Sequence, residues 1–150
     1  MQTPESHELE MAKWRDLVGG FILAFGEVEL LTLYLWRRYF ANEPPPHSFR
    51  ERTGKLLGPM KRDASVTQVL CDLLIEANRL ADERNTIAHN PVQAQVFSHT
   101  STGQYMIELA ITSPVSEHYI TDQRLSDLQT QTKELVRALW AEAQTQRLFA

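Results

Sequence analysis

The sequence contains very little cysteine and none of the common catalytic or phosphate-binding motifs. Cys71 is the single cysteine among 150 residues, which excludes a disulfide framework and a set of thiolate metal ligands. There is no Gly-x-Ser-x-Gly elbow, no Cys–His nucleophile set and no glycine-rich phosphate loop. Four histidines fall in different predicted elements, so the sequence predicts no metal site and no cofactor. They are His7, His47, His99 and His118.

A secretory signal and a clear membrane span are also lacking. The segment from Met1 to Glu5 has no basic stretch followed by an apolar run. The apolar stretch 17–36 contains Glu27 and Glu29, and two carboxylates within one span argue against a membrane helix. Together with the lone cysteine, these features predict a cytoplasmic protein without a membrane partner.

Length and composition predict one domain, residues 1–150, with a sizeable core, since 43% of the residues are hydrophobic and 23% are charged. The net charge of −4 argues against a protein that coats nucleic acid nonspecifically. Residues 37–62, however, hold seven basic and two acidic residues, a local charge of +5, so the remainder carries −9. This segment is either a phosphate-facing patch or a solvated loop. Its candidate RNA-binding residues are Arg37, Arg38, Arg50, Arg52 and Lys55.

The first predicted helix starts at Thr3-Pro4 and ends at Pro44-Pro45-Pro46. From Trp14 its apolar residues keep helical spacing, and Glu29 lies inside the apolar arc, whereas Glu27 lies on the opposite face. Further apolar residues lie off this arc: Leu23, Leu30, Leu31, Leu33 and Tyr34. A helix that is apolar around so much of its girth is buried from two sides, so a second copy of the chain is predicted to cover the outer side.

Two more helices are predicted in the middle of the chain. A capping box at 48–51 opens a short helix that Gly58-Pro59 stops. Asp63 or Ser65 is predicted to cap a long helix over 66–88, whose apolar residues repeat every three or four positions.

After Pro91 the period of the apolar residues changes to two, which predicts a β-hairpin from Val92 to Ile111. A last helix begins at about Asp122. The sequence therefore predicts a mainly α, up-and-down bundle of four to five helices with a small β-hairpin before the last helix.

The most informative stretch is the run Arg84-Asn85-x-x-x-His89 at the end of the long helix. At about 100° per residue, Arg84 falls in the middle of the apolar arc. An unpaired buried guanidinium is costly, so Arg84 must meet a carboxylate, a cleft or a second chain, and Glu29 is an inward-facing acid. Asn85 and His89 lie one turn apart on the flank of the arc. His89 sits in the last turn before Pro91, where the carbonyl end of a helix favours an imidazolium.

This run, following a long first helix with the inward acid Glu29, resembles the HEPN family, the nucleotide-binding domain shared by higher eukaryotes and prokaryotes. The resemblance spans most of the chain in layout, and Arg84, Asn85, His89 and Glu29 carry it. It implies a dimeric helical bundle that cleaves RNA without a metal, leaves a 2′,3′-cyclic phosphate, and acts as a toxin, antiviral effector or RNA processor. RNA, a second copy and an antitoxin or nucleotidyltransferase are the expected partners.

The residue types suit this chemistry. Histidine suits proton transfer near neutral pH, and arginine holds phosphate oxygens in two places, so His89 is the expected acid/base and Arg84 the phosphate binder. Asn85 would orient the ring or the phosphate, with Glu29 behind Arg84. Since Arg84 and His89 are about 140° apart around the helix, convergence is expected in a groove between two copies.

Two alternatives remain open at this point. Some HEPN-like proteins lack activity, so the chain can instead be a catalytically silent module that binds a nucleotide or a protein. In a purely structural interpretation, Arg84 pairs with Glu29 only to fix the bundle, and His89 only caps its helix.

Overall fold

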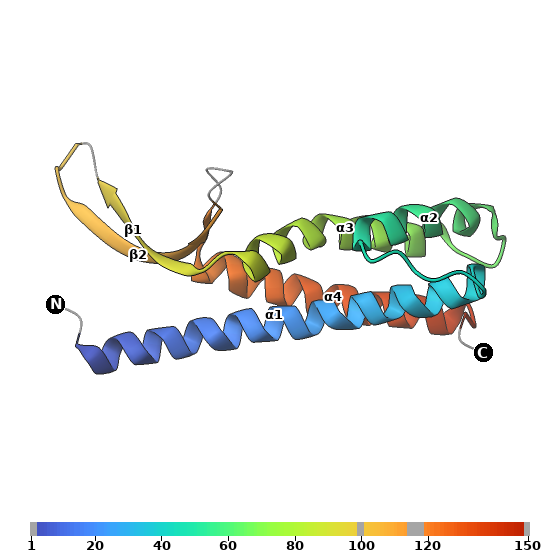
Figure 1. Ribbon diagram of the computed structural model, residues 1–150, viewed down its shortest axis with the longest axis horizontal. Coiled ribbons are helices and arrows are strands. Elements are labelled where there is room, and N and C mark those ends of the chain that lie inside the picture. The colour runs from blue at the N-terminus through green and yellow to red at the C-terminus, as the bar shows by residue number, and fades with distance from the viewer. Residues whose placement is uncertain (1–2, 99–100, 114–118, 149–150) are drawn as a thin grey trace.

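Four helices and three strands make up the described part of the chain (Figure 1). The computed structural model describes residues 3–98, 101–113 and 119–148, so His99, Thr100 and His118 lie outside the described residues. The helices are α1 (Pro4–Tyr39), α2 (Phe49–Arg62), α3 (Gln68–His89) and α4 (Asp122–Thr145). The strands are β1 (Val92–Ser98), β2 (Tyr105–Thr112) and β3 (Tyr119–Ile120). A mainly α fold with a small sheet before the last helix is thus confirmed.

Contacts between the helices fix their directions. Helices α1 and α4 run parallel, because Lys13 near the start of α1 pairs with Asp122 at the start of α4. At the other end, Arg38 donates to the carbonyl of Leu148. Helix α3 runs the opposite way, since its start contacts the end of α4 and its last turns contact the beginning. Residues 40–48 return along the bundle, so α2 runs parallel to α1 and the up-and-down order holds only from α2 to α4 (Figure 1).

A side-chain oxygen caps the start of each helix. Thr3 and Ser48 cap α1 and α2, as the sequence predicts. The predicted cap of α3 is wrong, because Thr67 takes this position rather than Asp63 or Ser65. The Asp63 carboxylate instead accepts hydrogen bonds from the N–H and the hydroxyl of Ser65, at 2.9 and 2.6 Å. These bonds close a turn, so α3 begins only after it.

Helix α1 ends at Tyr39, before the three prolines that were expected to stop it. The Phe40 N–H still donates to the Trp36 carbonyl, and the Phe40 ring stacks on the Trp36 indole at 4.3 Å. The Trp36 indole N–H donates to the Glu43 carbonyl at 2.8 Å. The chain therefore folds back over the end of α1 before it reaches Pro44.

Helix α2 continues through Pro59 to Arg62, whereas the sequence predicts a stop at Gly58-Pro59. A proline removes one backbone hydrogen bond, worth about 1 kcal/mol net, and strains the preceding turn. Leu56 and Met60, one turn apart, are both fully buried, and burying each contributes about 2 kcal/mol. Packing on both sides of the proline keeps the helix continuous.

The core lies along α1, against which the other three helices pack. Trp14, Trp36 and Cys71 are buried, and Trp140 is partly buried against the core. Leu31, which was expected off the apolar arc of α1, is fully buried. Val69, one of the apolar residues of α3, is 51% exposed, because the residues buried on α3 centre on positions 70, 74 and 77.

An apolar stripe stays exposed on α1. Leu23, Leu30 and Tyr34 are 76%, 42% and 38% exposed and follow one another at spacings of seven and four. By length and apolar composition alone, α1 is also able to cross a membrane. A third of its most apolar window is nevertheless buried inside the structure, against the other helices.

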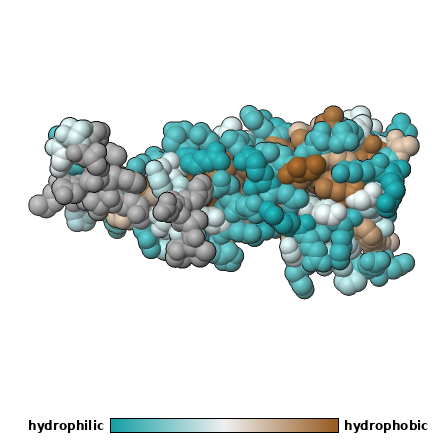
Figure 2. Space-filling model, turned by 90° about the horizontal axis from the view of Figure 1, so that it is seen from above, coloured by the Kyte–Doolittle hydropathy of each residue, from teal (hydrophilic) through white to brown (hydrophobic). Residues whose placement is uncertain are grey.

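The sheet projects from the bundle near the start of α1 (Figure 1). Strands β1 and β2 form the predicted antiparallel hairpin, in register from Val92 opposite Ile111 to Ser98 opposite Tyr105. Strand β3 adds two residues to the edge of β2, too short a segment to give a sequence pattern. Seen from the side of α2 and α3, the surface is largely hydrophilic, with apolar areas at the end away from the hairpin (Figure 2).

Candidate functional site

Arg84 links the end of α3 to the middle of α1. Its Nη2 lies 2.6 Å from Oε1 of Glu29, in a hydrogen-bonded ion pair whose side chains are 25% and 37% exposed. The predicted contact between Glu29 and Arg84 is therefore confirmed, and it forms within one chain. Both groups are half-buried, so solvent screens part of their attraction.

Two aromatic rings hold the guanidinium of Arg84 and that of a second arginine, Arg52. The Arg84 guanidinium carbon lies 5.3 Å from the centre of the Phe25 ring, and that of Arg52 lies 5.6 Å from the centre of the Phe49 ring. The two rings meet edge to face, with centres 5.1 Å apart. Cation–π contacts of this kind fix the plane of a guanidinium as well as its position.

Arg52 is buried at 6% exposure, although the sequence suggests a surface residue. Its Nε donates to Thr32 Oγ1 at 2.9 Å, and its Nη1 donates to the Pro46 carbonyl at 3.0 Å. Burial lowers the pKa of Arg52, the carboxylate of Glu29 opposes this shift, and the charge of Arg84 adds to it. The cluster of Glu29, Arg52 and Arg84 thus holds two positive charges against one negative charge.

A cavity of about 310 Å³ opens between the start of α2 and the last turns of α3. Its lining residues are His47, Ser48, Phe49, Arg50, Ala81, Asp82, Arg84 and Asn85. At its rim, Arg50 Nη2 donates to both carboxylate oxygens of Asp82, at 2.8 and 2.7 Å. The cavity therefore combines an imidazole, two guanidiniums and an amide, which are groups that bind a phosphate, with the carboxylate of Asp82, which does not.

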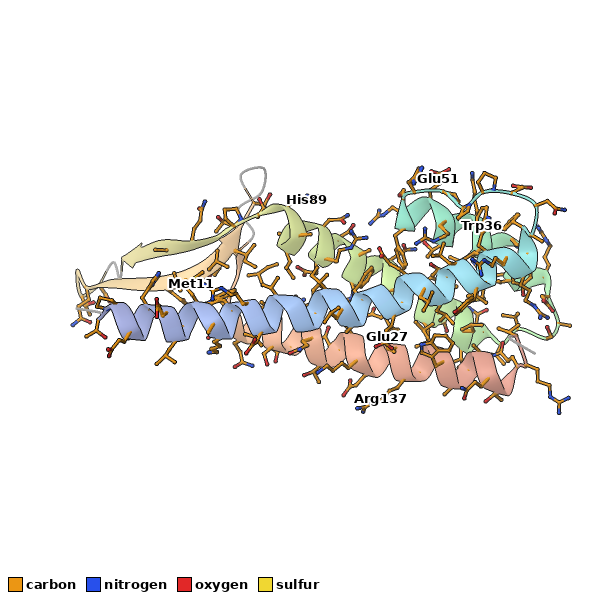
Figure 3. The ribbon with its side chains drawn as sticks, turned by 60° about the horizontal axis from the view of Figure 1, so that its bottom comes forward. Met11, Glu27, Trp36, Glu51, His89 and Arg137 are labelled. Atoms are coloured by element: carbon orange, nitrogen blue, oxygen red, sulfur yellow. The ribbon has the colours of Figure 1, made fainter. Side chains whose placement is uncertain are left out.

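His89 is the last residue of α3 and is exposed, as is Asn85 one turn earlier. Figure 3 shows His89 where α3 passes into β1, on the opposite side of α3 from the core. The structure brings Arg84 and Asn85 together at the cavity. His89 is not among the residues that line it. Asn90 closes the helix by donating from Nδ2 to the Thr86 carbonyl at 2.7 Å.

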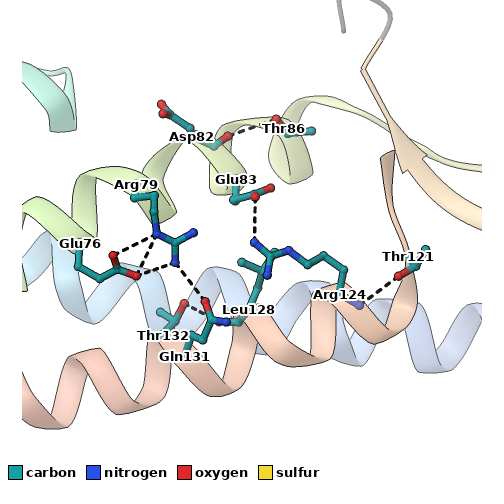
Figure 4. A network of polar contacts seen from close by, with 10 residues as sticks. All are labelled: Glu76, Arg79, Asp82, Glu83, Thr86, Thr121, Arg124, Leu128, Gln131 and Thr132. Carbon is teal, nitrogen blue, oxygen red and sulfur yellow. Dashed lines mark hydrogen bonds and ion pairs between the residues drawn. The ribbon is translucent and has the colours of Figure 1, made fainter. Parts of the chain in front are cut away.

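Hydrogen bonds on the other side of α3 fix it against α4 (Figure 4). Glu83 accepts from Arg124 Nη2 at 3.2 Å, and Arg79 bonds both Glu76 and Gln131. The neighbouring residue, Arg84, bonds α1 instead. Consecutive residues thus fasten α3 to two different helices, which sets the direction in which Asn85 and His89 face.

The five residues predicted to contact RNA have different environments. Arg37 and Arg38 are exposed at the end of α1. Arg50 and Lys55 are exposed but paired with carboxylates, Arg50 with Asp82 and Lys55 with Glu51 at 3.0 Å. Arg52 is the exception, since its guanidinium lies inside the protein and is bonded there. Its place in the predicted surface set is therefore corrected.

Sequence reasoning missed the contribution of α2 to the site. The spacing of Phe49, Arg52, Leu56 and Met60 places all four on one helical stripe, and this spacing could have indicated that Arg52 is buried. The presence of His47 at the same cavity as Arg84 depends on the return of residues 40–48, which no local pattern encodes.

No family model, no curated protein and no solved structure matches this chain. Within the described residues, no three histidine, cysteine, aspartate or glutamate side chains lie close enough together to hold a metal ion.

Proposed function

We propose that this protein is a metal-independent endoribonuclease of the HEPN type, which cleaves RNA to 2′,3′-cyclic phosphate ends. The placement of Arg84 carries the proposal. Glu29 and Phe25 hold its guanidinium from inside, while the residue lines a cavity with Asn85, one turn from His89. A guanidinium fixed in this way is preorganised for a phosphate and loses little freedom on binding it.

Each residue then has a distinct role. Arg84 binds the non-bridging oxygens of the scissile phosphate and stabilises the charge that grows on them during attack. Asn85 donates to the same phosphate or to the His89 ring, and His89 transfers a proton. Glu29 positions Arg84 and does not contact the RNA. The buried charge of Arg52 keeps the cluster cationic although Glu29 is paired.

A second copy of the chain covers the stripe of Leu23, Leu30 and Tyr34 on α1 in this proposal. Three large apolar side chains on one exposed face are a frequent mark of an interface. The protein then works as a cytoplasmic homodimer. RNA is its substrate, and an antitoxin or nucleotidyltransferase is a further partner that the HEPN resemblance suggests.

A catalytically silent module that binds a nucleotide or a protein is the second candidate. The ion pairs favour it, because Arg50 and Arg84, the two arginines that line the cavity, are each bonded to a carboxylate, Asp82 and Glu29. An anion must share or displace these carboxylates. Such a site can bind without providing the free charge that a transition state requires.

Cleavage of single-stranded RNA in excess EDTA separates the two candidates. The ribonuclease is expected to cut RNA and to leave a DNA strand of the same sequence intact, because DNA lacks the attacking 2′-hydroxyl. The 5′ fragment should end in a cyclic phosphate. Arg84→Lys should lower the rate nearly as much as Arg84→Ala, because a point charge cannot replace the planar fork. Folded wild-type protein that binds a nucleotide at this cavity but leaves RNA intact would establish the silent module instead.

A further inference from the structure

His47 lies at the same cavity as Arg84 and Asn85, although it is 37 residues away from Arg84 in the chain. It is exposed and directly precedes Ser48, whose hydroxyl caps α2 and thereby fixes the start of that helix. On the other side of His47, the hydrogen bond from Arg52 to the Pro46 carbonyl holds Pro46 in place. The backbone around His47 is therefore anchored to the helix that forms one wall of the cavity.

His89 belongs to the other wall, α3, and lies just beyond the residues that line the cavity. It lies four residues after Asn85 on α3, so the two side chains share a face and are about 6 Å apart along the helix axis. A phosphate held by Arg84 and Asn85 has His47 across the cavity and His89 one turn along α3. One imidazole, that of His47, thus lines the cavity, and a second, that of His89, lies one turn along α3 from Asn85, outside the lining.

We propose that His47 is a second catalytic residue, which acts with His89 of the same chain on a phosphodiester bound by Arg84 and Asn85. The proposal rests on the proposed ribonuclease function and adds a group that this reaction requires. Cleavage through the 2′-hydroxyl needs one group to accept a proton and another to donate one. In this proposal both histidines come from a single chain, and the phosphate reaches His89 through Asn85, which is about 40° from His89 around α3, rather than through a groove between two copies.

The ends of the two helices distinguish the roles. His47 precedes the amino end of α2, which carries positive partial charge, and His89 occupies the carboxyl end of α3, which carries negative partial charge. We therefore assign His47 as the base and His89 as the acid. His47 takes the proton of the 2′-hydroxyl as O2′ bonds to phosphorus. The bond from phosphorus to O5′ breaks, and O5′ takes the proton of His89. The products are a 2′,3′-cyclic phosphate and a free 5′-hydroxyl.

The first test compares His47→Ala and His47→Gln with the control His7→Ala, in which an exposed histidine near the start of α1 is removed. Both His47 variants should lower the rate of RNA cleavage by about 10²-fold or more, while His7→Ala should cleave at the wild-type rate. Unchanged thermal unfolding shows that the variants are folded. Cleavage by wild type with no loss in the His47 variants overturns this inference alone, whereas intact RNA with wild type overturns the proposed function as well.

An RNA with sulfur in place of the scissile O5′ tests the roles. A thiolate leaves without protonation, so this substrate needs the base but not the acid. His89→Ala should regain most of its lost rate on it, and His47→Ala should remain slow. The reverse pattern overturns the assignment of base and acid.

Mixed dimers test whether the two histidines belong to one chain. When His47→Ala and His89→Ala chains are co-expressed and purified together, each chain lacks one of the two groups, so the mixture should stay inactive. If each site instead took His47 from one chain and His89 from its partner, the mixed dimer would hold one intact site. Recovery of activity in the mixture overturns the pairing within one chain.

Discussion

Removing Glu29 should destabilise the protein more than removing Arg84, although the two form one ion pair. Glu29→Gln leaves Arg84 and the buried Arg52 without the acid that offsets their charge. Arg84→Met leaves Glu29 near Arg52, whose pKa responds to the charge of Glu29. The second variant therefore keeps one charge of each sign, and the first keeps two of the same sign.

The expected size lies between two limits. Exposed pairs contribute about 0.2–1 kcal/mol, and breaking a fully buried pair costs about 3–5 kcal/mol. The side chains of Glu29 and Arg84 are 37% and 25% exposed, so values toward the lower limit apply. Glu29→Gln should lower the free energy of unfolding by about 2 kcal/mol and Arg84→Met by about 1 kcal/mol, with a coupling of about 1 kcal/mol between them.

Urea unfolding of the wild type, both single variants and the double variant gives these free energies. They are comparable when the free energy of unfolding falls with urea concentration at the same slope in all four proteins. Arg52→Met is the matched control, because it removes the excess positive charge, and Glu29→Gln should cost less in that background than in the wild type. The reasoning fails if Arg84→Met costs more than Glu29→Gln, or if the two changes are additive.

Three further expectations concern assembly, pH and helix propensity. Light scattering coupled to size exclusion should give twice the 17.2 kDa chain mass, and Leu23→Lys should give a monomer; a wild-type monomer at micromolar concentration would remove the proposed dimer. Bonds from Ser65 and Tyr39 lower the pKa of Asp63 from 3.8 to about 2, so its contribution to stability is present above pH 4 and is lost as the pH falls through 2. In urea titrations the difference between wild type and Asp63→Asn should shrink over that range, and a constant difference would contradict this. Gly19→Ala should raise the free energy of unfolding by about 1 kcal/mol, since an added Cβ meets nothing within 4 Å, and a loss would show a contact at that face.

Local sequence patterns were sufficient to predict most of the fold. Helical spacing and the caps Thr3 and Ser48 gave the starts of α1 and α2, and alternation gave the hairpin. The errors occurred where distant contacts override local preference. Burial of Leu56 and Met60 against the other helices carries α2 through its proline. At the end of α1 the chain instead folds back locally, with the Trp36 indole bonded to the Glu43 carbonyl, before it reaches the prolines.

The site could be predicted only in part. The angular position of Arg84 around the helix predicted that it faces inward. A buried guanidinium needs a partner, which indicated Glu29, and the contact of 2.6 Å between the two confirms this. Arg52 looked like one more cation in a basic segment, because net charge does not distinguish a buried guanidinium from a solvated one. The convergence of His47 with Arg84 follows from the path of residues 40–48, which sequence spacing does not specify.

The rate of RNA cleavage by His89→Ala is the most direct test of the central claim. Purified wild type, His89→Ala and the control His7→Ala are compared on one single-stranded RNA in excess EDTA, at matched concentration and after unfolding curves have shown that all are folded. The ribonuclease account predicts cleavage by wild type and His7→Ala, and a rate lower by about 10²-fold or more for His89→Ala. Equal cleavage by all three would place the activity elsewhere, and intact RNA with folded wild type would contradict the account.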